Sequence, residues 1–218
     1  MLSRILPRLH LLLSIPLIGL HLPAAEVRVA AIDQKGLSVA ELVIWLEPLD
    51  APPPPANPEE LFATVEQVDE EFDPYTIAVR TGTKVEFPNR DQVQHHVYSL
   101  SKPAQFEIPL HGGDETESVV FDQAGLVPIG CNIHDWMLSY VVVVDTPWFG
   151  TTGDDGTLQL GDLPEGRYKL SAWHPRLRNA DEREITLFDG ELTELSLELR
   201  LRPDRRLRRA PSSGGAKY

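Results

Sequence analysis

Short strand patterns separated by turn signals recur along most of this chain, and they constrain its fold more than any other feature. Residues 26–32 alternate apolar and polar side chains before the turn Asp33-Gln34-Lys35-Gly36, and residues 192–201 alternate leucine with polar residues. No long apolar series with helical spacing and caps accompanies them. Short strands at such even spacing are typical of β-sandwiches. We therefore predict an all-β protein.

The largest group of strand patterns lies at 60–146. It holds about seven or eight short strands, the number expected of a Greek-key sandwich. Thr81-Gly82-Thr83 separates strands predicted at 75–80 and 84–87, so we expect a tight hairpin-like turn there. A mostly apolar strand is predicted at 138–144.

A second, smaller sandwich is predicted at 147–201, where the strand patterns are too few to complete it. Strand patterns at 26–50 precede a stiff, proline-rich linker at 51–59, which cannot join a central strand. We favour an arrangement in which residues 26–50 complete the second sandwich, so that the 60–146 unit is an insertion. The alternative assigns residues 26–48 to the 60–146 unit as its own edge strands.

The N-terminal segment 1–25 has the features of a secretory signal peptide. Arg4 and Arg8 precede an apolar run at 11–20, which is too short to span a bilayer, and small residues follow at Ala24-Ala25. An uncleaved membrane anchor is the alternative interpretation. No other stretch is long and apolar enough to span a membrane. We expect the mature protein outside the cytoplasm, in a bacterial periplasm.

The chain is acidic, with 33 Asp and Glu against 20 Lys and Arg and a net charge of −13. Seven of the bases fall after residue 199, where Asp204 is the single acid. The acidic body argues against nucleic-acid binding, which needs a basic face, and it favours steered encounter with a basic partner. The segment 202–218 has no core-forming pattern, so we predict a basic, disordered tail.

Cys131 is the only cysteine, and in an exported chain it cannot form an intramolecular disulfide. Pairing between chains, inert burial and metal binding are the explanations to weigh. The cysteine begins the series Cys131-x-x-His134-x-x-Met137, and His95-His96 lies upstream. One thiolate, two imidazoles and a weak thioether form the ligand set of a blue-copper electron-transfer site. On an extended strand His95 and His96 point to opposite faces, so we expect only one of them in that set.

The segment from Phe87-Pro88-Asn89 to His95, taken with the Cys131-x-x-His134-x-x-Met137 loop, resembles the cupredoxins. The short loop is most similar to that of amicyanin, and the surrounding sequence resembles the plastocyanin-like "methylamine utilization" group of bacteria. Residues 156–168 are similar in their turn chemistry to carboxypeptidase-regulatory-like or transthyretin-like sandwiches. The resemblance implies a Greek-key cupredoxin β-sandwich followed by a smaller sandwich of that second kind.

Carried over residue by residue, the resemblance implies one type 1 copper per chain, with the ligands His95, Cys131, His134 and Met137. It also implies that a backbone amide beside the first histidine donates to the cysteine sulfur. His96 stands where the family usually has asparagine. Asp135 replaces a proline that often follows the second histidine, and our hypothesis is that its charge favours Cu(II) and lowers the reduction potential.

Three further residues carry expectations of their own. His111 and His174 lie in predicted loop or turn surroundings, so we expect both at the surface. Trp136 is expected either to shield the metal site or to pack on the ligand loop.

No acid–base pair, phosphate-binding glycine loop or nucleophilic triad is recognisable, so we do not expect an enzyme. The expected function is one-electron transfer through an exposed edge of His134. The expected partners are redox proteins, such as a dehydrogenase or a c-type cytochrome, with no nucleic acid and no stable membrane span in the mature chain. Two alternatives remain open: a copper-binding or delivery protein, and a noncatalytic binding module whose second sandwich carries the function.

Overall fold

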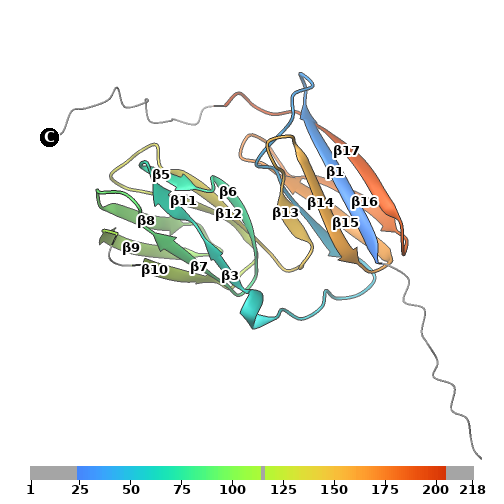
Figure 1. Cartoon of the computed structure of the whole chain (residues 1–218), viewed down its shortest axis with the longest axis horizontal. Coiled ribbons are helices and arrows are strands. Elements are labelled where there is room, and N and C mark those ends of the chain that lie inside the picture. Colours follow the sequence, from blue (N-terminus) through green and yellow to red (C-terminus); the bar gives the residue numbers. More distant parts are fainter. Residues whose placement is uncertain (1–23, 114–115, 205–218) are drawn as a thin grey trace, which may run out of the picture.

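The computed structural model describes residues 24–113 and 116–204, and its regular elements there are strands apart from one 3₁₀ helix, η1 (Pro58–Glu60) (Figure 1). The all-β prediction is confirmed. The signal peptide predicted at 1–25 and the tail predicted at 202–218 fall almost wholly outside the described residues. Within those residues, no helix has the length and apolar character needed to cross a membrane.

The central unit, residues 60–146, is formed by two sheets that pack around one apolar core. The sheets have the strand orders β6-β12-β11-β8-β9 and β10-β7-β3, and the hairpin β4-β5 is a separate pair. Phe87, Phe121 and Ile129 are fully buried between the two sheets. The strands are β3 (Phe62–Thr64), β4 (Glu66–Val68), β5 (Glu71–Asp73), β6 (Thr76–Arg80), β7 (Thr83–Pro88), β8 (His95–Leu100), β9 (Gln105–His111), β10 (Thr116–Phe121), β11 (Gly125–Gly130) and β12 (Leu138–Val144).

The hairpin predicted at Thr81-Gly82-Thr83 is wrong. Strand β6 pairs with β12 in the five-stranded sheet, whereas β7 pairs with β10 and β3 in the other sheet. The turn therefore carries the chain from one sheet across the core to the other. The short spacing suggested a hairpin, but both strands have long-range partners, which the local sequence does not reveal.

The flanking unit is a second sandwich, built from strands on either side of the central unit in the sequence. Its sheets have the orders β14-β1-β17 and β13-β2-β15-β16. Because β1 and β2 precede the central unit and the other strands follow it, the central unit is inserted between β2 and β13 (Figure 1). The strands are β1 (Ala25–Asp33), β2 (Val43–Pro48), β13 (Phe149–Thr151), β14 (Thr157–Leu163), β15 (Gly166–Trp173), β16 (Asp181–Leu187) and β17 (Leu192–Leu199).

Strand β12 connects the cores of the two units, because both of its faces are buried. Val141 and Val143 point into the core of the central unit, while Val142 and Val144 pack with Val43 of the flanking unit. This explains the nearly continuous apolar run of the strand, which is typical of strands covered on both faces. The loop immediately before β12 is thereby anchored to a strand with little freedom to move.

Gly156 closes a tight turn in the flanking unit, and we expect its replacement by alanine to destabilise the protein. Its φ is +76°, and an added Cβ would lie 2.6 Å from the carbonyl oxygen of Ala31. The left-handed conformation and this clash with backbone should together cost about 3 kcal/mol of unfolding free energy. Gly161 is the control, because its Cβ would meet nothing closer than 3.9 Å. Denaturant melts should show the loss for Gly156→Ala only, and equal losses would contradict this account.

Candidate metal centre

Three of the four predicted ligands come from the loop between β11 and β12. Cys131 follows the last residue of β11, and Met137 precedes the first residue of β12. The two strands pair directly, with Gly130 opposite Leu138, so the loop is held at both ends. Gly130 also pairs with Tyr98 of β8, whose first residue is His95. The topology thus brings the start of β8 beside the loop.

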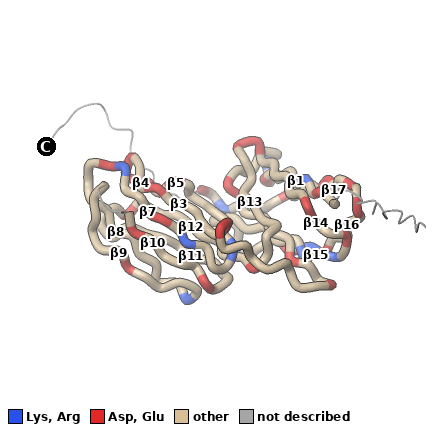
Figure 2. The backbone as a smooth tube through the Cα atoms, turned by 60° about the horizontal axis from the view of Figure 1, so that its bottom comes forward, with Lys and Arg blue, Asp and Glu red and all other residues tan. Residues whose placement is uncertain are grey.

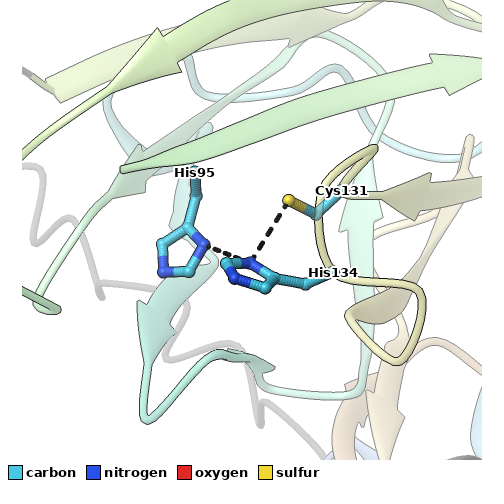
Figure 3. A group of neighbouring side chains, drawn as sticks. All are labelled: His95, Cys131 and His134. Atoms are coloured by element: carbon cyan, nitrogen blue, oxygen red, sulfur yellow. Dashed lines mark hydrogen bonds between the residues drawn. The ribbon is translucent and has the colours of Figure 1, made fainter. Parts of the chain in front are cut away.

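His95, Cys131 and His134 converge on one another (Figure 3). The Nδ1 atoms of the two histidines lie 3.0 Å apart, and the cysteine Sγ lies 3.8 Å from Nδ1 of His134. All three candidate ligand atoms fall within 4.8 Å of one another. His95 and Cys131 are buried, and 15% of the His134 side chain is exposed. Two imidazole nitrogens and a sulfur therefore face a single point inside the protein.

Met137, the fourth predicted ligand, lies in the same apolar cluster as Cys131 and is only 2% exposed. Its backbone N–H donates to the carbonyl oxygen of His134 over 3.0 Å, which closes a turn within the loop. The Met137 thioether is thus buried in the same cluster as the Cys131 thiol.

Asp91 fixes the orientation of His95, and sequence reasoning missed it. Its carboxylate lies 2.7 Å from the Nε2 atom of His95, and its own backbone N–H donates to the side chain of Asn89. A carboxylate on one ring nitrogen holds the proton there, so the other nitrogen, here Nδ1, can give up its own proton and bind a metal through its electron pair. The spacing of four residues between Asp91 and His95 was the signal available in the sequence.

The surroundings of Cys131 favour its thiolate. Burial raises the pKa of the thiol, but hydrogen bonds from His95, from the backbone amides of His96 and Ile133, and from His134 outweigh burial. Together they lower the pKa from 9.0 to about 6. Burial lowers the pKa of His95, yet its hydrogen bonds to Cys131 and Asp91 raise it above its ordinary value. The amide contact from His96 is the one that the cupredoxin resemblance implies.

In the metal-free protein, we expect the thiolate absorbance of Cys131 to titrate with a midpoint near pH 6 rather than at 9.0. Because the thiol is more acidic in the folded chain, its contribution to stability is complete above pH 9 and is lost as pH falls toward 6. His95→Ala should move the midpoint upward, since it removes a hydrogen bond to the thiolate. Cys131→Ser supplies the baseline, and a midpoint above about pH 8 in the parent protein would contradict the described hydrogen bonds.

The remaining histidines occupy other surroundings. His96 is buried, and its Nε2 lies 2.9 Å from a carboxylate oxygen of Glu107, outside the three-residue cluster. The prediction that His111 and His174 lie at the surface is wrong, because each is only 4% exposed. His111 is held by Gln67, whose side-chain nitrogen lies 3.1 Å from its Nε2. The local sequence around both histidines indicated loops or turns, and it does not reveal the distant strands that bury them.

Comparison with solved structures finds partial likenesses. A purple cupredoxin from Nitrosopumilus maritimus is 21% identical, with a TM-score of 0.34, and the match covers 38% of this chain and 99% of that one. A reduced tryptophan-to-tyrosine variant of amicyanin is 23% identical, with a TM-score of 0.36 and coverages of 39% and 84%.

A Cu-containing nitrite reductase from Thermus scotoductus is 25% identical, with a TM-score of 0.37, and the match covers 45% of this chain and 25% of that one. Comparison with protein families finds no match, and comparison with curated proteins finds none either. Since each structural likeness spans less than half of the chain, the function proposed below rests on the geometry of the site.

Proposed function

We propose that this chain is a type 1 copper protein that acts as a one-electron carrier. The observation that carries the proposal is the convergence of two imidazole Nδ1 atoms and a buried, acidic thiol on one point. A soft thiolate suits Cu(I), and imidazole suits both oxidation states, so the donor set fits copper. Copper bound there supplies a reversible Cu(II)/Cu(I) couple.

His95, Cys131 and His134 would hold the metal, with Met137 as a weak fourth ligand. His95 is fully buried and hydrogen-bonded to Asp91, and Cys131 and Met137 belong to the core of the central unit. Side chains packed in this way move little when the charge of the site changes, so little reorganisation opposes electron transfer. We propose one copper per chain and no catalytic role.

The proposed partners are redox proteins, such as a dehydrogenase or a c-type cytochrome, met in a bacterial periplasm. Acidic side chains outnumber basic ones along most of the described backbone (Figure 2). A surface of this kind speeds encounter with a positively charged partner and makes the rate dependent on salt. No feature of the site requires nucleic acid.

Cycling the copper-loaded chain between oxidation states tests the carrier function. Ascorbate should bleach the visible band with one electron per chain, and ferricyanide should restore it. A Cu(I) chelator present throughout should capture little metal, because the three ligand side chains remain in place. Transfer of the copper to the chelator on reduction would instead support the delivery function.

A further inference from the structure

The turn between β4 and β5 holds two residues in an unusual backbone conformation. Asp69 and Glu70 have φ values of +55° and +57°, a region that residues other than glycine seldom occupy. The carboxylate of Asp91 accepts the backbone N–H of Asp69 over 2.7 Å and that of Glu70 over 2.8 Å. The carboxylate that orients His95 therefore also holds this turn in place.

The turn covers the outer edge of His134. A carboxylate oxygen of Glu70 lies 4.0 Å from Nε2 of His134, and the two side chains are 19% and 15% exposed. The indole N–H of Trp136 donates to the backbone carbonyl of Glu70 over 2.9 Å, and its ring centroid lies 5.3 Å from that of His134. The edge expected to be exposed is thus largely covered by a carboxylate and an indole.

Each of the two imidazoles therefore has one carboxylate near its outer nitrogen. Asp91 lies at Nε2 of His95, and Glu70 lies within ion-pair distance of Nε2 of His134. In both rings the Nδ1 atom faces the centre of the cluster. Asp135, for which the sequence suggested a similar effect, is exposed.

We propose that the charge of Glu70, beside His134, lowers the reduction potential and favours positively charged redox partners at this edge. This inference rests on the copper function proposed above. The contact is longer than a hydrogen bond, so Glu70 acts on the His134 ring through its charge across 4.0 Å. Its negative charge stabilises Cu(II) more than Cu(I), because the oxidised site is more positive by one charge. A cationic reactant is attracted to the same edge.

Glu70→Gln is the informative variant and Glu71→Gln is its matched control. Glutamine keeps the length of the side chain and the backbone carbonyl that Trp136 contacts, but it removes the charge. Glu71 is the next residue on the hairpin and is exposed. In copper-loaded full-length protein, Glu70→Gln should raise the reduction potential by about three times the shift of Glu71→Gln, with the visible band retained in both.

Small inorganic reactants test the charge preference directly. Tris(phenanthroline)cobalt(III) takes one electron from the Cu(I) protein and becomes Co(II), and hexacyanoferrate(III) takes one electron as an anionic complex and becomes Fe(II). Glu70→Gln should lower the ratio of the cationic to the anionic rate constant by about five-fold, and Glu71→Gln by less than about two-fold.

Equal potentials and equal rate ratios in the two variants would overturn the role of Glu70 while leaving the copper function intact. Absence of a visible thiolate–copper band in the parent protein would instead overturn the copper function itself.

Discussion

Replacing Cys131 by serine is expected to abolish the visible absorption of the copper-loaded protein. The band of a type 1 site arises from charge transfer between thiolate and Cu(II), and a serine hydroxyl supplies no such donor. Serine is nearly isosteric, so the loop between β11 and β12 should keep its fold. Absorbance and metal content, measured on the same samples, should fall together at the high-affinity site.

The matched control is the unfolding midpoint of the metal-free proteins at about pH 5, where the thiolate no longer adds stability; there it should differ little between Cys131→Ser and the parent chain. A serine variant that kept the band would show that the sulfur is not a ligand. A variant that lost the band because it no longer folded would show a shifted midpoint. The two causes of loss are therefore separable.

Replacing His95 by alanine is expected to remove the type 1 spectrum, whereas His96→Ala should keep it. The Nδ1 atom of His95 faces His134, while His96 points to Glu107. The contact of His96 with Cys131 is through its backbone amide, which alanine retains. We expect His95→Ala to weaken Cu(II) binding by at least about 100-fold and His96→Ala by less than about five-fold.

Competition with a chelator of known affinity measures both constants, and electron paramagnetic resonance reports the geometry of whatever copper remains. If the spectrum were lost in His96→Ala and kept in His95→Ala, the first ligand would be His96 and our assignment to His95 would be wrong. Such a reversal would also remove the proposed role of Asp91, whose contact is with His95.

The closeness of three of the four candidate ligands could be predicted from the sequence because they share one short loop. Loop residues between paired strands stay close in any sandwich, so Cys131, His134 and Met137 needed no knowledge of the fold. The proximity of His95 depends on the pairing of β8 with β11. It was expected only because the cupredoxin resemblance placed His95 in the ligand set. Asp91 and Glu70 were missed because their contacts depend on where the β7–β8 loop and the β4–β5 turn lie in the folded chain.

Long-range strand pairing also limited what the sequence could predict of the fold. Alternation in residues 26–32 indicated a strand, but the pattern does not identify its partners, so assigning residues 26–50 to the second sandwich was the favoured one of two arrangements. In the structure β1 pairs in parallel with β17, which lies near the other end of the described sequence, and β2 pairs with β15. The hairpin predicted at Thr81-Gly82-Thr83 was wrong for the same reason, because distant strands decide which sheet each of its two strands joins.

Visible spectroscopy and electron paramagnetic resonance of the parent protein loaded with one equivalent of Cu(II) decide whether these residues form a type 1 copper site. We expect an intense visible band together with a small copper hyperfine splitting, both characteristic of a thiolate and two imidazoles around one copper. A colourless complex with the large splitting of a tetragonal Cu(II) site would contradict this expectation.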